Sequence, residues 1–120
     1  MTVASEWNME AGLLTHRCTG QIDRVDLAVA AQRWSTALAG VEVFDVLWDL
    51  GGAQLMIALH DIETDADILG GCIDLRRTKG QTTFLVASEL NALILNSIMV
   101  SRTHYPAWRV NKFERVADSA

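Results

Sequence analysis

Two short, nearly continuous apolar runs constrain the fold of this chain more than any other feature. Val43 to Leu50 reads VFDVLWDL, and Thr82 to Ala87 reads TTFLVA. Apolar runs of this length, with β-branched and aromatic members, are typical of strands covered on both faces, as in parallel sheets. Gly51-Gly52 is expected to end the first run, and residues 53–58 are expected to form a turn and a brief strand.

Strand-like and helix-like segments alternate along the rest of the chain. Leu13 to Thr19 is expected to form the opening strand, ended by Gly20, and residues 108–114 the last one. Asp23 is expected to cap a helix, and Ser88 to cap another that runs to Arg102. The apolar face of the first helix carries Leu27, Ala31, Trp34 and Leu38. A third helix is expected over Asp61–Arg77. This order of elements predicts an α/β sheet with helical crossovers.

The size and composition of the chain indicate one folded domain spanning residues 1–120. Half of its 120 residues are hydrophobic, which is enough for one core and excludes a disordered chain. The net charge of −5 argues against a nucleic-acid-binding domain, which needs a basic face. No export signal precedes the domain and no apolar run is long enough to span a membrane, so we expect a cytoplasmic protein.

The charges are divided unevenly along the chain. Residues 1–75 hold three basic and twelve acidic residues, whereas residues 76–120 hold seven basic and three acidic ones. The two halves either intermingle in one body or form a polar monomer that docks onto a second copy or an oppositely charged partner. Cys18 and Cys72 have no zinc-site spacing, and we expect both to be buried free thiols.

Several stretches together resemble the SpoIIAA-like, or STAS/SEC14-type, small bacterial domains. They are LLTHRCTGQID, VLWDLGGAQL, TTFLVASELNALILNSI and RVNKFERVADSA. The resemblance implies a mixed, mostly parallel sheet of four or five strands with helices packed against it. It also implies a regulatory or protein-interaction module, because the anti-sigma-factor antagonists of this family act in that way.

Serine phosphorylation switches these antagonists, at a serine about eight residues after the Asp-Leu strand. The corresponding segment here, Gln54 to Leu59, reads QLMIAL and contains no Ser or Thr. The phosphorylation switch is therefore not expected to carry over. Other family members are related by fold to lipid-binding domains, which implies an alternative function as a small carrier. An apolar or lipid-like ligand would then lie between sheet and helices near Trp48, Met56 and Leu95.

Candidate ligand-binding residues lie where the predicted strands end. Asp49, Gly51 and Ser88 follow or close predicted strands, and the carboxyl ends of parallel strands form the usual ligand edge of an open sheet. The alternative is that Ser88 only caps its helix and Asp49 only bonds to loop amides. An enzyme would need two of His60, Asp49 and Ser88 within hydrogen-bond reach. We expect no catalytic residues, no metal site and no cofactor.

The helix after Ser88 is apolar on more than one face, which favours a second copy of the chain as partner. Its candidate interface residues are Leu95 and Met99. Trp7 and Trp108 are further candidates for an interface or a pocket rim. The sequence thus predicts a homodimer, with another protein as a second possible partner. Trp48 and Trp34 are expected in the core.

Overall fold

The computed structural model describes residues 2–58, 80–101 and 108–112. They form five strands, β1 (Thr2–Asn8), β2 (Leu13–Ile22), β3 (Asp45–Leu55), β4 (Thr82–Val86) and β5 (Trp108–Lys112). Two helices accompany them, α1 (Arg24–Ala37) and α3 (Glu89–Ser101). The helix expected over residues 61–77 lies outside the described residues.

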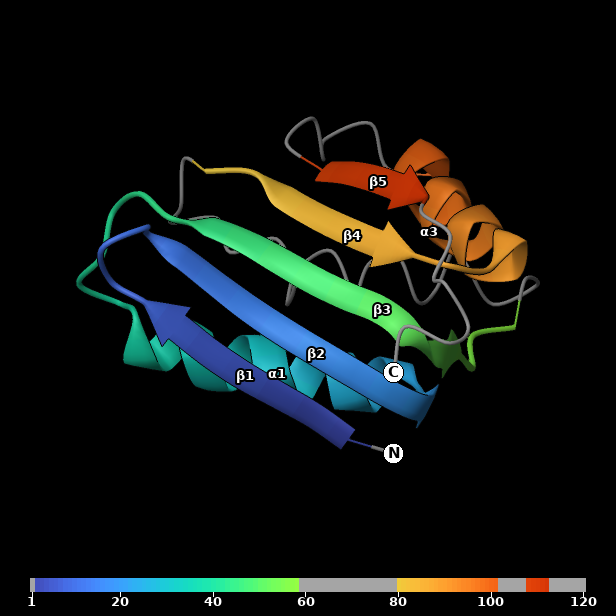
Figure 1. Cartoon of the computed structure of the whole chain (residues 1–120), viewed down its shortest axis with the longest axis horizontal. Coiled ribbons are helices and arrows are strands. Elements are labelled where there is room, and N and C mark those ends of the chain that lie inside the picture. The colour runs from blue at the N-terminus through green and yellow to red at the C-terminus, as the bar shows by residue number, and fades with distance from the viewer. Residues whose placement is uncertain (1, 59–79, 102–107, 113–120) are drawn as a thin grey trace, which may run out of the picture.

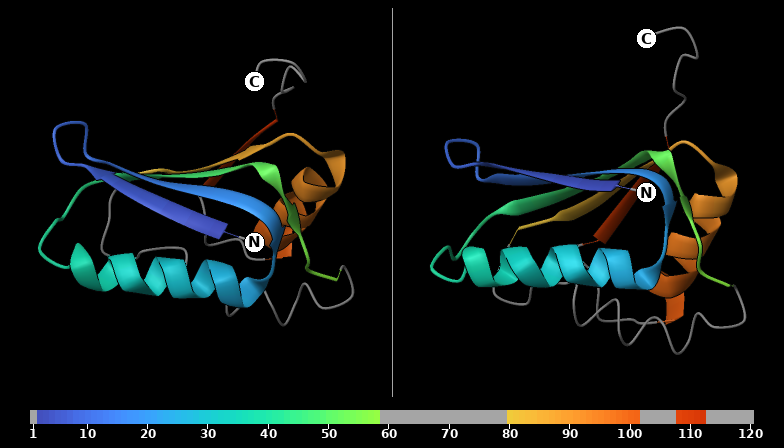
Figure 2. Two further views of the ribbon diagram at one scale, coloured as in Figure 1. Left: turned by 60° about the horizontal axis from the view of Figure 1, so that its bottom comes forward. Right: turned by 90° about the horizontal axis from the view of Figure 1, so that it is seen from below.

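The five strands form a single mixed sheet in the order β1-β2-β3-β4-β5 (Figure 1). β1 pairs antiparallel with β2, and the three remaining pairs are parallel. The mixed, mostly parallel α/β sheet is therefore confirmed. Both described helices lie on the same side of the sheet, with α1 beneath β1 and β2 (Figure 2).

β1 is a strand that the sequence analysis did not predict. Its sequence, TVASEWN, alternates exposed and half-buried residues as an edge strand does. A tight connection joins it to β2, in which Gly12 adopts a φ of 61° and the side chain of Asn8 accepts a bond from the Ala11 amide at 3.0 Å. A residue with a Cβ is strained at such a φ, so this turn requires glycine.

α1 begins at the predicted cap. The Asp23 carboxylate accepts a bond from the Asp26 amide at 2.9 Å, and the Asp26 carboxylate accepts one from the Asp23 amide at 3.0 Å. This reciprocal pair is a capping box, which satisfies two amides that the first turn leaves without partners. On the predicted apolar face, Leu27, Ala31 and Leu38 are buried in the core and Trp34 is half-buried against it.

Glycine does not end β2 or β3, and both strand predictions were wrong at this point. β2 continues through Gly20, which takes a φ of 76°, and β3 continues through Gly51-Gly52 to Leu55. The strands remain paired beyond the glycines, with Gly20 opposite Ala53. Glycine tolerates the local twist and bulging that these long strands need, so it marks a bend in the pair.

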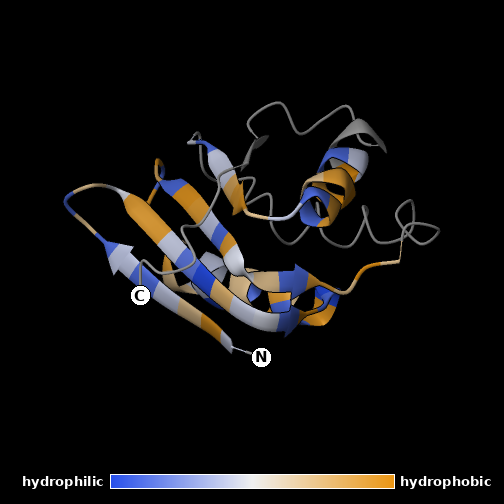
Figure 3. Cartoon of the chain, turned by 45° about the vertical axis from the view of Figure 1, so that its right-hand side comes forward, coloured by the Kyte–Doolittle hydropathy of each residue, from blue (hydrophilic) through white to orange (hydrophobic). Residues whose placement is uncertain are grey.

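One face of the sheet carries the core. Alternate residues of β3 and β4 are buried beneath the helices, among them Trp48 and Phe84, and hydrophobic and hydrophilic residues alternate along the strands (Figure 3). Leu47 and Asp49 point to the other face and are half-buried. The expectation that residues 43–50 are covered on both faces was wrong, because Val43 is 59% exposed and Asp45 is exposed as well.

Gly80 leads into β4 in close contact with the chain before β3. A Cβ at this position would stand 1.9 Å from the carbonyl oxygen of Phe44, so no larger residue fits. Beside it, the Gln81 amide donates to the Asp45 carboxylate at 2.8 Å. These contacts fix the start of the β3–β4 pair.

Cys18 is a buried free thiol, as predicted. Burial raises the pKa of the Cys18 thiol to about 12, with further contributions from the Asp49 and Asp26 carboxylates. The thiol therefore stays protonated and unreactive at neutral pH. Cys72 lies outside the described residues. Among the helices the structure describes, none is long and apolar enough to cross a membrane.

Candidate functional site

The predicted ligand residues Asp49 and Gly51 form a β-bulge. Between the pairs Arg17–Asp49 and Thr19–Gly52, β2 contributes one residue and β3 contributes two. The Asp49 carboxylate accepts a bond from the Gly51 amide at 3.0 Å, at the place where the ladder is interrupted. The local role of these residues is thus to hold the bend in β3.

Ser88 caps α3, as predicted. Its hydroxyl oxygen accepts a bond from the Asn91 amide at 3.0 Å, and its carbonyl oxygen accepts one from the Ala92 amide at 3.2 Å. Asp49 and Ser88 each bond to an amide of their own turn. His60, the third residue of the possible catalytic set, lies outside the described residues.

Asn91 is a structurally important polar residue that the sequence analysis missed. It is buried, and its side-chain amide donates to the carbonyl oxygen of Ala53 at 2.9 Å and accepts from the amide of Leu55 at 3.0 Å. The Asn91 side chain thereby supplies the hydrogen bonds that a neighbouring strand would make to the last residues of β3. The sequence signal that could have indicated its burial is its spacing, three residues before Ile94 and seven before Ile98, which places it on the helix face that packs on the core.

A row of aromatic rings crosses the buried face of the sheet. The His16 ring stacks on Trp48 with centroids 4.0 Å apart, and Trp48 stacks on Phe84 at 6.4 Å. These residues are direct register partners on β2, β3 and β4. His16 Nδ1 is hydrogen-bonded to the hydroxyl of Ser5 on β1 at 2.7 Å.

The Ser5–His16 pair has the residue types of a nucleophile and its base, but it lacks the necessary basicity. Burial lowers the pKa of His16 from 6.5 to about 4. A general base works best with a pKa near the working pH, and an imidazole this weak gains little by taking the serine proton. The pair is better described as the polar end of the aromatic row.

We expect His16 to make the stability of the protein depend on pH. The unfolded chain takes up a proton here near pH 6.5 and the folded protein only near pH 4, so the contribution is complete above about pH 6.5 and is lost as the pH falls toward 4. Between about pH 7.5 and about pH 5 the free energy of unfolding should fall by about 2 kcal/mol from this group.

The measurement is urea unfolding across this range for the wild type and for His16→Phe, which keeps a ring beside Trp48 and cannot titrate. The difference between their pH slopes isolates the imidazole from the carboxylates. Equal slopes for the two proteins would contradict the expectation.

Leu95 is not a surface residue, which corrects its predicted place in an interface. It is 1% exposed and lies in the core with Ile94 and Ile98. The outward-facing leucines of α3 are instead Leu90, 46% exposed, and Leu93, 51% exposed. Leu95 was assigned to an interface because the helix is apolar on more than one face, but the buried face includes the polar residue Asn91 beside Ile94 and Leu95.

Of the other predicted interface residues, Trp7 lies at the edge of the core, and the side chains of two are not described. Trp7 is half-buried and packs edge-on against Phe44, with ring centroids 5.8 Å apart, so it belongs to the border of the core. The side chains of Met99 and Trp108 lie outside the described residues.

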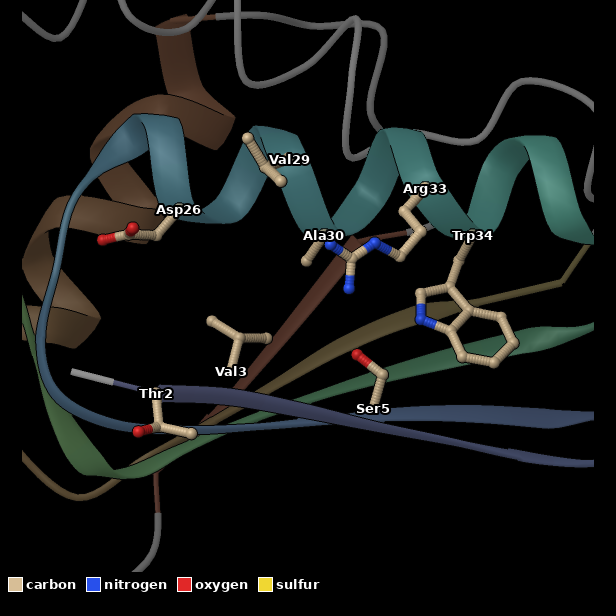
Figure 4. Close-up of a pocket in the computed structure, with 8 residues that line it drawn as sticks. All are labelled: Thr2, Val3, Ser5, Asp26, Val29, Ala30, Arg33 and Trp34. Atoms are coloured by element: carbon tan, nitrogen blue, oxygen red, sulfur yellow. The ribbon is translucent and has the colours of Figure 1, made fainter.

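A cavity of about 210 Å³ lies between β1 and α1 (Figure 4). Val3 and Ser5 line it from the strand, and Arg33 and Trp34 line it from the helix. None of Trp48, Met56 and Leu95 lines this cavity, and Trp48 and Leu95 are packed inside the core. This cavity is therefore not at the place predicted for an apolar ligand. Among the residues described, no three His, Cys, Asp or Glu side chains are grouped so as to hold a metal ion.

Comparison with models of known protein families found no match, and comparison with curated proteins found none. The similar solved structures include the following two. The anti-sigma factor antagonist SpoIIAA in its unphosphorylated form is 15% identical, with a TM-score of 0.59 over 92% of this chain and 88% of that one. An uncharacterised DUF3478-family protein from Shewanella loihica PV-4 is 19% identical, with a TM-score of 0.53 over 98% of this chain and 88% of that one. The predicted likeness is thus confirmed at the level of fold: the chain has a SpoIIAA-like fold.

Proposed function

We propose that the protein is a non-catalytic regulatory module that acts by binding a protein partner through the outer face of α3. The observation that carries the proposal is the exposure of Leu90 and Leu93, one helical turn apart, on a helix whose other face is anchored in the core. Apolar side chains gathered on a rigid helix are typical of docking surfaces. Figure 3 shows the hydrophobic segments of α3 in orange.

Met56 extends this surface at the N-terminal end of α3. It is 49% exposed and directly follows Leu55, whose amide is bonded to the side chain of Asn91. Leu90 is the chain neighbour of Asn91, so the two exposed side chains belong to the same corner of the molecule. We call Met56, Leu90 and Leu93 the α3 surface.

The proposed occupant of the α3 surface is a second copy of the chain. A two-fold pair would place the same leucines against each other, which is how homodimer interfaces form. Glu89 is the only charged residue of α3, and it lies at one end. In an antiparallel pair of α3 helices the two Glu89 side chains are at opposite ends, so no like charges meet in the middle.

The fold relatives support an interaction function. SpoIIAA is an anti-sigma factor antagonist, a protein that acts on another protein. The absence of Ser and Thr from residues 51–59 leads us to propose regulation without phosphorylation in this segment.

The test is the oligomeric state of the intact protein by sedimentation equilibrium at micromolar concentrations. We expect a dimer for the wild type and a monomer for Leu93→Glu, because each dimer would bury two carboxylates against apolar side chains. Val25→Glu is the matched control, since Val25 is 58% exposed on α1 and is not part of the α3 surface.

The expected result is that Val25→Glu stays dimeric and both variants keep the circular dichroism spectrum of the wild type. A monomeric wild type would overturn the second copy as occupant. A dimer that survives Leu93→Glu but is lost in Val25→Glu would move the interface to α1.

A further inference from the structure

The cavity between β1 and α1 has the size of a small organic molecule. Its volume is about 210 Å³, and an engineered cavity of about 150 Å³ in another protein binds benzene. A ring or a short alkyl chain with one polar group therefore fits, whereas a long-chain lipid is too large. The cavity is lined by β1 and α1, which lie at one side of the sheet, whereas α3 lies toward the other side, beside β5 (Figure 1).

Hydrogen-bond donors converge on one part of this cavity. Figure 4 shows two donors, the Arg33 guanidinium and the Trp34 indole nitrogen, directed toward the same space as the Ser5 oxygen, which is already hydrogen-bonded to His16. Neither the guanidinium nor the indole nitrogen has a partner among the residues that the structure describes. A guanidinium offers paired N–H groups that match the two oxygens of a carboxylate.

Ser5 is held in place from behind. Its hydroxyl is bonded to His16 Nδ1 at 2.7 Å, and His16 is fixed by its stack on Trp48. The hydroxyl therefore stands at a fixed position in the cavity, which reduces the ordering that a bound ligand would require of it.

The remaining walls decide which anions are compatible. Val3, Val29 and Ala30 provide an apolar surface for the body of a ligand. Asp26 lines the cavity as well, and its carboxylate faces away from Arg33 at the other end (Figure 4). A second carboxylate at the far end of a ligand held by Arg33 would come near Asp26, so a monocarboxylate is favoured over a dicarboxylate.

We propose that the cavity binds a small monocarboxylic acid with an apolar body, whose carboxylate pairs with Arg33 and whose body packs on Val3, Val29 and Ala30. The body is an aromatic ring or a medium-length alkyl chain. Such a ligand would bridge β1 and α1. This inference is independent of the proposed docking function, since none of its residues belongs to the α3 surface.

Binding is measured by isothermal titration calorimetry with three probes. Phenylacetate tests the aromatic body and octanoate tests the alkyl body. Phenylacetamide has the shape of phenylacetate without its charge. We expect saturable binding of at least one acid, and the stronger of the two identifies the class of body. No saturable binding of either acid up to about 10 mM, or equal binding of phenylacetamide and phenylacetate, would overturn the proposal.

Two pairs of variants locate the site. Arg33→Gln should weaken binding of the acid about tenfold to hundredfold, the usual effect of a charge-assisted hydrogen bond. Arg17→Gln is its control, because Arg17 is an exposed arginine on the sheet face away from the helices. Val29→Trp should fill the cavity and abolish binding, whereas Val25→Trp, one turn earlier on α1, places the same side chain outside the lining.

All four substituted side chains are exposed in the wild type, so the variants should fold, and thermal unfolding checks that they do. Equal binding by Arg33→Gln and Arg17→Gln would overturn the assignment of Arg33. Leu93→Glu should bind the acid as the wild type does. The ligand site and the docking function can therefore fail separately.

Discussion

Leu95→Glu is expected to leave the protein unfolded, whereas Leu93→Glu, two residues away on the same helix, leaves it folded. Leu95 is 1% exposed in the core, and Leu93 is 51% exposed. A carboxylate at position 95 would be buried among Ile94, Ile98 and the sheet with no partner, which costs more than about 4 kcal/mol. The lost packing of the leucine adds about 2–5 kcal/mol, and a small domain has about 5–15 kcal/mol of total stability, so the two losses together remove most or all of it.

The measurement is far-UV and near-UV circular dichroism together with urea unfolding of both variants. Leu93→Glu should lie within about 0.5 kcal/mol of the wild type, as surface substitutions do. Leu95→Ala provides a milder check, with an expected loss of about 2–5 kcal/mol from the cavity it creates. A folded Leu95→Glu with wild-type stability would show that the core face of α3 is not the one described.

Trp48→Ala is expected to lower the free energy of unfolding by about 3–5 kcal/mol. Trp48 is buried at the centre of the sheet, and its ring lies between those of His16 and Phe84. Removing it leaves a void and breaks the aromatic row at its middle. The expected measurement is a lower urea midpoint with an unchanged slope, which marks a loss of stability without a change in compactness.

Trp48→Phe is the matched control for the aromatic ring. The indole nitrogen of Trp48 is buried without a hydrogen-bond partner among the described residues. Phenylalanine removes that unpaired donor while keeping a ring, so the smaller volume is partly offset and the loss should be roughly 1–2 kcal/mol. Equal losses for alanine and phenylalanine would show that a phenyl ring cannot replace the indole in the aromatic row.

The sequence predicted the strands and caps whose signals are local. The Asp23 cap depends on a carboxylate and the amide three residues later. The β4 strand is indicated by five consecutive residues of high strand preference. These contacts need no knowledge of the rest of the chain. β1 was missed because Ala, Ser and Glu have weak strand preference, and its pairing with β2 supplies what its own composition lacks.

The predicted site failed where position in space decides the role of a residue. The prediction treated Gly20 and Gly51 as strand ends, but pairing between β2 and β3 carries both strands past them. Leu95 was predicted at an interface but lies in the core, on the same helix face as the buried Asn91. The burial of Asn91 depends on its hydrogen bonds to β3, to residues 36 and 38 positions away in the chain, which a local pattern does not reveal. The cavity likewise joins Arg33 to Ser5 across two elements, and no spacing within one segment indicates it.

The order of strands across the sheet matches their order along the chain. No strand has to be inserted between two that are already paired, because each one adds to the edge left by the strand before it. The β1–β2 hairpin is local, and α1 then packs beside it before β3 is required. As the chain emerges from a ribosome, the described sheet can therefore grow in one direction, and the growing edge at β2, β3 and β4 is covered each time by the next described strand.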